Sequence, residues 1–287
     1  MNHPQTLRAW AKINLGLRIL NKRPDGYHNI ESIFHYIDWY DSLQFTAASG
    51  FSFSCSDTRL PVDDQNLVVR AVRRVESILG FTFPFHIHLI KSIPFGAGLG
   101  GGSSDAATVL RFAQRQWPGK LSDDTLGHIA AFLGSDVNFF LSPVTQIASD
   151  RGIHLKPLNF TIPGWILTAF PPTEVPTGWA YQQVRPFDRY ERSLTDIAND
   201  HPPIDNYTGL FVNDFDEPIA RLKPEIAQLK SKLQSTGALY VSLSGSGSAC
   251  FAVYNDKSRA ELAAGLLSAE VPVSLTPPGF LPDSQYF

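Results

Sequence analysis

Alternating apolar and polar positions predict two long extended segments at the start of the chain. Residues 6–20 alternate loosely and are rich in Leu and Ile, and residues 33–45 form a second such segment that breaks near Tyr40 and Asp41. Between them, the Arg-Pro-Asp-Gly run at residues 23–26 is typical of a tight turn, because Pro presets φ and Asp-Gly tolerates left-handed backbone. The chain therefore opens with two predicted strands joined by a turn.

A helix and a half-buried strand are predicted next. Apolar residues recur with a helical period over residues 67–79, where Asp64 or Asn66 can cap the helix and Gly80 can end it. Phe, Ile and Leu then alternate with His over residues 85–89, as in a strand with one buried face. A glycine-rich loop follows this strand.

Two more helices are predicted after the loop. The first is opened by Ser103 or Ser104 and carries Ala, Val and Leu at helical spacing. The second starts at Ser122, has two aspartates in its first turn, and ends at Gly134. The first half of the chain thus mixes strands and helices.

The second half begins with a cluster of Pro and Gly over residues 157–186, which indicates loops and a change of domain near residues 150–160. The predicted elements are a strand at residues 165–170, helices that begin near Pro218 and Pro224 and end at Gly237, and strands at residues 239–243 and 249–254. Strands and helices alternate, but without the strict rhythm of a parallel sheet. We therefore expect an α+β fold in two domains, residues 1–155 and residues 156–287.

Composition supports a globular protein with its own core. The 287 residues include 43% hydrophobic and 18% charged side chains, and the formal net charge is −3. A chain of this length buries about three quarters of its extended surface without needing disulfides or a structural metal. The negative charge argues against a dedicated nucleic-acid binder, yet it allows a local basic pocket for a small anionic substrate.

We expect neither a signal peptide nor a membrane span. Cys55 and Cys250 are too few for a disulfide scaffold, residues 1–10 do not resemble a signal peptide, and no stretch approaches the ~20 apolar residues of a membrane span. We expect a soluble, cytoplasmic protein with no nucleic-acid or membrane partner. The sequence leaves the oligomeric state open.

The segment at residues 94–107 carries the clearest chemical signal. Five of the seven residues from 96 to 102 are glycine, which is costly in chain entropy unless backbone must approach a ligand closely. Backbone N–H groups of such a loop can point inward, and the helix that follows adds the positive end of its dipole. Phosphate is the natural ligand, with Ser103 and Ser104 adding hydroxyl groups to phosphate or to a metal-bound water.

Other interpretations of this segment are weaker. A flexible surface loop has no obvious use between a strand and a helix. The Gly-x-Gly-x-x-Gly spacing from Gly96 also fits a dinucleotide fingerprint, which needs an acidic residue about 20 positions later at a strand end. Asp123 and Asp124 lie near there but belong to the predicted helix. Ser103 stands where the Walker pattern needs Lys, which excludes an ordinary P-loop, and protein-kinase signatures are missing.

Three further positions are candidates for chemistry. Lys12 and Asn14 are two apart in a predicted strand and therefore share a face, although a lysine there can also sit on an exposed edge. Asp136 precedes an apolar run, where a carboxylate is either a helix cap or a positioned base, and that window alone favours the cap. Neither the histidines nor the cysteines have zinc-site spacing, so we expect no zinc site.

Two loops offer binding groups. Tyr27-His28 follows the predicted turn and places a flat ring beside a polar ring, which suits a nucleobase but is also common in packed turns. The Ser-Gly-Ser-Gly-Ser run at residues 244–248 can form a second anion-binding nest, and a plain hairpin turn explains it about as well.

Taken together, these segments resemble one family. Lys-Ile-Asn-Leu at residues 12–15, Arg-Pro-Asp-Gly-Tyr-His at residues 23–28, the run at residues 94–107, Gly-Ser-Asp-Val at residues 134–137, Asn-Asp at residues 213–214 and the loop at residues 244–248 occur in that family's order. The chain resembles the 4-diphosphocytidyl-2-C-methyl-D-erythritol kinases of the galactokinase, homoserine kinase and mevalonate kinase superfamily. The resemblance spans about residues 8–254.

The resemblance implies a two-domain fold with a cleft between an N-terminal ATP-binding domain and a C-terminal substrate-binding domain. It implies ATP-dependent phosphorylation of the 2-hydroxyl of the cytidylyl substrate in the non-mevalonate route to isoprenoid precursors, with ATP and Mg²⁺ required. Another small-molecule kinase of the superfamily, with a mevalonate- or homoserine-type acceptor, is the alternative. The Tyr27-His28 turn argues for a pyrimidine acceptor.

The resemblance also assigns site residues. The catalytic pair falls on Lys12 and Asp136. The ATP side falls on Asn66, Lys91, Pro94, Gly96, Gly98, Leu99, Gly100, Gly101, Gly102, Ser103 and Ser104. The substrate side falls on Asn14, Tyr27, His28, Thr177, Tyr181, Gly245 and Ser246. In these roles Asp136 accepts or orients the proton of the substrate hydroxyl, and Lys12 stabilises the developing alkoxide.

The sequence departs from the family pattern at two places. Asn138 stands where the family commonly has proline after the Asp-Val pair. Residues 146–155 lack the usual Gly-x-Gly-Glu run, and Arg151-Gly152-Ile153 is the nearest match. These departures bear on the backbone near Asp136 and on the join between the domains.

Overall fold

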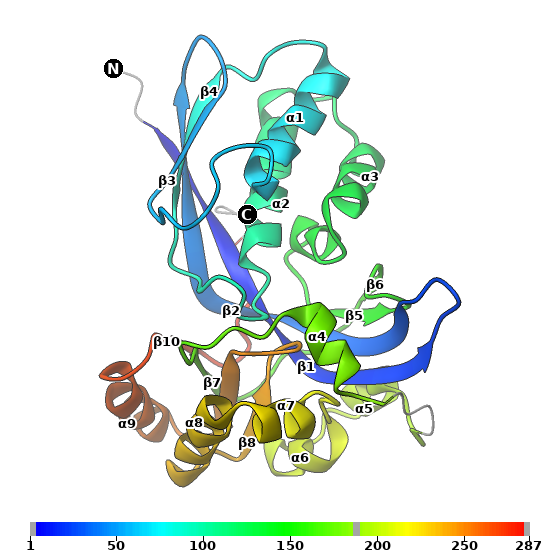
Figure 1. The fold of residues 1–287 in the computed structure, drawn as a ribbon, viewed down its shortest axis with the longest axis vertical. Coiled ribbons are helices and arrows are strands. Elements are labelled where there is room, and N and C mark those ends of the chain that lie inside the picture. The colour runs from blue at the N-terminus through cyan, green and yellow to red at the C-terminus, as the bar shows by residue number, and fades with distance from the viewer. Residues whose placement is uncertain (1–3, 186–189, 284–287) are drawn as a thin grey trace.

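Two mixed layers of sheet and helix make up the protein in a computed structural model that describes residues 4–185 and 190–283 (Figure 1). The larger sheet has six strands in the order β3-β4-β2-β5-β6, with β1 paired to β2. The smaller sheet has four strands in the order β10-β7-β9-β8. Almost all pairings are antiparallel, and only β3 and β4 run parallel among the described strands. The α+β expectation is confirmed.

The first two strands form the central framework of the whole molecule. β1 (Gln5–Lys22) and β2 (His28–Ala47) pair antiparallel along nearly their full length and are joined by the predicted turn. The expected break in the second strand is wrong, because β2 continues through Tyr40 and Asp41. A bulge accommodates the irregularity instead, since Trp10 faces Tyr40 while Lys12 faces Tyr36.

Three helices cover one face of the larger sheet (Figure 1). α1 (Leu67–Leu79) is capped by the Asn66 side chain, which accepts from the Val68 N–H, and it ends at left-handed Gly80 as predicted. α3 (Asp123–Leu133) is capped by Ser122, again as predicted. α2 (Gly101–Gln116) begins two residues before Ser103, so the predicted serine start is wrong.

The helix α2 starts early because Gly100 serves as its cap. Gly100 lies in left-handed backbone at φ 72° and makes no side-chain cap bond. The glycine run thus supplies both the loop and the first turn of the helix. The backbone N–H groups that begin α2 consequently lie within the glycine-rich segment itself.

The smaller sheet carries the second half of the chain. Three predicted strands pair here, close to their predicted bounds: β7 (Trp165–Ala169), β8 (Tyr240–Leu243) and β9 (Cys250–Tyr254). The predicted strand β4 (Phe85–Ile90) belongs instead to the larger sheet. α7 (Asp216–Leu222) and α8 (Pro224–Ser235) correspond to the two predicted proline-led helices. Figure 1 shows them with α9 on the outer side of this sheet.

Several elements, most of them short, were not predicted. They are β3 (Ser52–Cys55), β5 (Gln146–Ser149), β6 (His154–Pro157), β10 (Val273–Thr276), α4 (Thr177–Gln182), α5 (Leu194–Asn199), α6 (Tyr207–Leu210), α9 (Lys257–Ser268) and two 3₁₀ turns, η1 (Val137–Leu141) and η2 (Ile204–Asn206). Most span a single turn or four residues, too short for a periodic pattern.

The predicted domain boundary at residues 155–156 falls inside β6, a strand of the larger sheet. The larger sheet ends with β6 at Pro157, and the smaller begins with β7 at Trp165. The apolar core nevertheless runs across this line, because Ile13 and Ile33 from the long strands cluster with Ile166 and Phe251. The boundary at residues 155–156 stays a prediction. Across residues 4–185 and 190–283, the structure contains no helix with the length and apolar character of a membrane span.

Candidate active site

Two cavities meet at the glycine-rich loop. The first, about 420 Å³, is lined by the loop and by residues that lead into α1, including Asn66, Lys91 and Asp105. The second, about 310 Å³, is lined by Lys12, Asn14, Asp136, Thr177, Tyr181, Gly245 and Ser246. Gly98 and Ser103 line both. Both volumes suit small-molecule ligands, so the loop forms a wall shared by two binding sites.

The glycines of the loop differ in whether the surrounding protein leaves room for a side chain. A Cβ at Gly98 would lie 2.2 Å from the Ser244 carbonyl oxygen, and one at Gly100 would lie 2.7 Å from the Phe140 ring. A Cβ at Gly96 would meet nothing within 4 Å, although its φ is 69°. Protein packing therefore requires glycine at Gly98 and Gly100, whereas Gly96 has open space beside it.

Lys12 lies at the centre of the second cavity. Its side chain is only 4% exposed, so the edge-strand alternative is wrong. The Nζ donates to Asn14 Oδ1 at 2.6 Å and to the Gly98 carbonyl at 3.1 Å, and it lies 3.5 Å from Asp136 Oδ2. Asn14 is held in turn because its Nδ2 donates to Ser32 Oγ at 2.8 Å. The ammonium and the carboxylate are thus brought together from β1 and from the start of η1.

Asp136 is free to act on a ligand. It precedes the 3₁₀ turn η1, but its side chain makes no cap bond to that turn. The helix-cap interpretation, which the local sequence favoured, is therefore wrong. Its carboxylate is 30% exposed and accepts a long hydrogen bond of 3.4 Å from the Ser135 hydroxyl. An ionised carboxylate in this position can accept or orient a proton in the cavity.

A buried group of one ammonium and two carboxylates supports the first cavity. Lys91 Nζ contacts Asp41 and lies 3.0 Å from Asp105 Oδ2. The Asp41 carboxylate also accepts from the Ser92 and Ile93 N–H groups, at 2.6 and 2.9 Å. Asp105 has no such backbone donors, and its Oδ1 is buried without a hydrogen-bond partner.

The protonation of this group follows from its geometry. Burial raises the pKa of Asp105 to about 8, with the Asp41 carboxylate adding to the rise and Lys91 opposing it. Burial alone would lower the pKa of Lys91, but the two carboxylates raise it above its usual value. Lys91 therefore stays charged, and Asp105 is the carboxyl that holds a proton near neutral pH.

The remaining predicted ATP-side residues, except Ser104, line the first cavity. Asn66 Nδ2 donates to the Pro61 carbonyl at 2.8 Å while its oxygen caps α1, so its amide is already engaged. Pro94 and Ser103 line the cavity. Leu99 lines it too, and its carbonyl accepts from the Lys12 N–H at 3.0 Å. Ser104 is buried and does not line either cavity described above.

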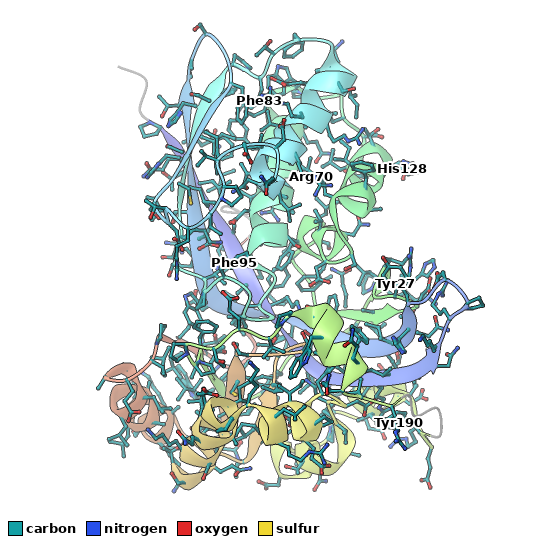
Figure 2. All side chains as sticks on the ribbon, viewed as in Figure 1. Tyr27, Arg70, Phe83, Phe95, His128 and Tyr190 are labelled. Atoms are coloured by element: carbon teal, nitrogen blue, oxygen red, sulfur yellow. The ribbon has the colours of Figure 1, made fainter. Side chains whose placement is uncertain are left out.

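Aromatic rings lie beside the second cavity, where Tyr181 and Phe215 form part of its wall. His28 stacks on Tyr181 with ring centroids 5.1 Å apart, and the Tyr181 ring meets Phe215 edge-on at 5.0 Å. Burial and then the Asp136 carboxylate raise the pKa of Tyr181 to about 12, so its phenol stays neutral. Tyr27 is 59% exposed. Figure 2 shows it at the β1–β2 turn, well away from Phe95 by the glycine-rich loop.

The loop at residues 244–248 joins β8 to β9 as a hairpin and also closes the site. Ser244 Oγ donates to the Gly98 carbonyl at 2.9 Å, and Ser246 Oγ donates to Thr177 Oγ1 at 3.4 Å. The Gly245 carbonyl accepts from Asn213 Nδ2 at 2.9 Å. The loop therefore packs on the glycine-rich loop and presents Gly245 and Ser246 to the second cavity.

Four site residues were not predicted. Asp41 and Asp105 support Lys91, Ser32 orients Asn14, and Arg151 lines the second cavity. Of these four residues, only Asp41 gave a signal in the sequence, as an aspartate at a buried position of a strand. Ser32 and Asp105 act only through partners distant in sequence. Within the described residues, no group of three or more His, Cys, Asp or Glu side chains could hold a metal ion.

Family models match both halves of the chain. The model described as the GHMP kinases N terminal domain matches residues 66–142, which include the glycine-rich loop and Asp136. The model described as GHMP kinases C terminal matches residues 198–272, which include the loop at residues 244–248.

Curated relatives match nearly the full length. The 4-diphosphocytidyl-2-C-methyl-D-erythritol kinase of Chlorobium phaeovibrioides is 44% identical over 284 residues, covering 96% of this chain and 97% of that protein. The enzyme of the same name from Chlorobaculum tepidum is 40% identical over 279 residues, covering 96% and 98%.

Solved structures agree with this match. A crystal structure of 4-(cytidine 5'-diphospho)-2C-methyl-D-erythritol kinase has a TM-score of 0.82 at 32% identity, covering 96% of this chain and all of that one. The mevalonate kinase of Methanococcus jannaschii has a TM-score of 0.72 at 12% identity, covering 97% and 99%, and shares the fold.

Proposed function

Because the chain belongs to the 4-diphosphocytidyl-2-C-methyl-D-erythritol kinase family, we propose that its two joined cavities are the donor and acceptor sites of that reaction. The enzyme transfers a phosphoryl group from ATP to the 2-hydroxyl of 4-diphosphocytidyl-2-C-methyl-D-erythritol, giving the 2-phosphate and ADP in the non-mevalonate pathway. The observation that supports the proposed site is the Lys12–Asp136 pair, 3.5 Å apart, beside the wall that both cavities share.

Lys12 and Asp136 form the proposed catalytic pair. A substrate hydroxyl is a poor nucleophile, so Asp136 accepts its proton or orients it toward the donor. Lys12 stabilises the negative charge that develops on the attacking oxygen. Its position is fixed by Asn14 and by the Gly98 carbonyl, so the ammonium is oriented before substrate binds. Positioning of this kind supplies much of the catalysis in phosphoryl transfer.

The glycine-rich loop is the proposed site for the triphosphate of ATP. Open space beside Gly96 leaves room for a ligand, and the first N–H groups of α2 lie in the same segment. Those N–H groups and the helix dipole favour negative charge. Lys91 also lines this cavity, where its charge is paired with Asp41 and Asp105.

A Mg²⁺ ion fits the join between the cavities through few protein ligands. Mg²⁺ usually binds one or two protein oxygens together with substrate phosphates and water. Ser103 and Asp136 both line the second cavity and supply a hydroxyl and a carboxylate there. Ser103, which lines both cavities, would hold the ion together with the phosphates of ATP, and the bound ion would offset negative charge on the transferring group.

The aromatic group is the proposed site for cytosine. Tyr27, His28 and Tyr181 offer stacking faces, and His28 also offers ring nitrogens that can recognise a base edge. Burial and then the charge of Lys22 lower the pKa of His28, which favours the neutral imidazole with one donor and one acceptor. Thr177 and Ser246 also line the second cavity.

The experiment is an acceptor comparison with purified protein. ATP consumption is measured with the cytidylyl substrate, with mevalonate and with homoserine, and the product is identified by phosphorus NMR. We expect turnover with the first alone and phosphate on its 2-oxygen. Turnover only with mevalonate or homoserine would overturn the assignment of the acceptor cavity.

A further inference from the structure

The tip of the β5–β6 hairpin is fixed against the β1–β2 turn. Asp150 lies in left-handed backbone at φ 59°, followed by Arg151 and by Gly152 at φ 84°. The Asp150 carboxylate pairs with Arg23, and its carbonyl accepts from the Ile30 N–H at 2.7 Å. These contacts hold Arg151 in place even though the sequence here lacks the family's usual glycine pattern.

Arg151 contacts the Tyr27 ring and also lines the second cavity. Its guanidinium carbon lies 4.8 Å from the centroid of the Tyr27 ring, at the proposed cytosine site. Arg151 is also one of the residues that line the cavity that holds Lys12 and Asp136. Arg151 therefore adjoins both places where the two parts of the substrate are expected to bind.

The guanidinium has no charged partner of its own. Within residues 4–185 and 190–283, it makes no hydrogen bond or ion pair with the protein, although its charge helps to lower the pKa of nearby Asp25. The Asp25 carboxylate is already bonded to Arg23 and to the Tyr27 N–H. Among the described residues that line the cavity, Asp136 is the only one with a carboxylate, and that carboxylate faces Lys12.

We propose that Arg151 binds the diphosphate of the acceptor and so selects a nucleoside-diphosphate substrate. The inference rests on the proposed function, in which cytosine binds at Tyr27 and His28 and the alcohol binds at Lys12 and Asp136. The diphosphate joins these two parts covalently, and Arg151 touches both of their sites. A guanidinium matches phosphate oxygens in bidentate geometry, better than a lysine at the same place would.

This arrangement gives Arg151 a role in specificity. An acceptor without the diphosphate leaves the guanidinium in water and gains nothing from it. The cation–π contact with Tyr27 holds the guanidinium near the base, so binding of the base and of the diphosphate reinforce each other. Acceptors that carry only an alcohol and a carboxylate lose both contributions.

The test is Arg151→Met, which keeps an unbranched side chain over Tyr27 and removes the charge. The matched control is Arg74→Met, because the Arg74 guanidinium lies 3.6 Å from the Phe132 ring and lines neither cavity. Inhibition constants of cytidine 5′-diphosphate and of cytidine are measured against the cytidylyl acceptor. Thermal unfolding of each variant checks that it folds.

Arg151→Met is expected to weaken the binding of cytidine 5′-diphosphate by about tenfold, the lower end for a charge-assisted hydrogen bond. It should weaken the binding of cytidine far less. Arg151→Lys should fall between, and Arg74→Met should change neither constant. Equal weakening of the binding of both inhibitors would overturn the inference and leave Arg151 as a packing partner of Tyr27. Unchanged binding of both inhibitors would also overturn it. A wild-type enzyme that does not turn over the cytidylyl acceptor would instead overturn the proposed function.

Discussion

Replacement of Gly98 by alanine tests whether the glycine-rich loop is held by protein packing. The new Cβ would lie 2.2 Å from the Ser244 carbonyl oxygen and 3.1 Å from that of Gly247, at a φ of 77°. Both obstacles are backbone atoms, so the two loops must move apart. Gly96→Ala is the matched control, because its φ of 69° is similar while its Cβ would meet nothing within 4 Å.

The magnitudes separate strain from collision. Left-handed backbone costs an alanine roughly 1–2 kcal/mol, and this cost applies to both variants. Overpacking adds roughly 1–3 kcal/mol at Gly98 alone. At about 2 °C per kcal/mol for a chain of this size, Gly96→Ala should lower the Tm of the ligand-free protein by about 2–4 °C. Gly98→Ala should lower it by a further 2–6 °C or so.

The same substitution should impair catalysis. The Gly98 carbonyl accepts from Lys12 Nζ, so a displaced loop also displaces the ammonium. A misplacement of about 1 Å can cost about 10²-fold in rate. Calorimetry gives the Tm values, and kcat is measured with both substrates saturating. Equal losses of Tm in Gly98→Ala and Gly96→Ala would refute the packing argument.

Three further predictions follow from the site. Asp136→Asn should lower kcat by at least ~10²-fold, the lower end for general-base catalysis, while ATP affinity measured by calorimetry stays near normal; near-normal turnover would show that Asp136 is not the base. Tyr27→Ala should raise the KM for the cytidylyl acceptor more than the KM for ATP, and the reverse order in steady-state kinetics would place Tyr27 on the donor side. The pKa of Asp105 is raised to about 8, above the ~3.9 of an unfolded aspartate. Between these two pH values the folded protein binds one more proton than the unfolded chain, so its free energy of unfolding falls as pH rises from about 4 to about 8. Asp105→Asn imitates the protonated carboxyl and should flatten that part of the pH profile in denaturant titrations, and an unchanged slope would contradict the assignment.

Local sequence patterns predicted the elements that stabilise themselves. The helix over residues 67–79 combined an apolar period, an Asn66 cap and a Gly80 end, and the structure has all three. The long strand over residues 6–20 was predicted from a looser alternation, and the structure has it as β1. Elements that depend on a distant partner were not predicted. β5 pairs with β2 and β6, and its four residues have no pattern of their own.

The candidate site shows the same division. Spacing in one strand placed Lys12 and Asn14 on a shared face, and the structure joins them by a hydrogen bond. No local pattern could bring Asp136 to Lys12, because their meeting depends on the packing of η1 against α2 and the sheet. The local sequence even favoured a cap for Asp136. Family resemblance supplied the pairing, and the geometry is consistent with it.

The bond from Lys12 to the Gly98 carbonyl has an evolutionary consequence. A mutation that reshapes the nucleotide cradle also moves the ammonium that faces the alcohol, so preference for the donor and rate toward the acceptor cannot drift independently. Divergence toward new acceptors is then easier at the aromatic end, where Tyr27 and Arg151 lie on exposed turns, than at this shared wall. An inhibitor that spans Gly98 would meet a surface where escape mutations carry a catalytic penalty.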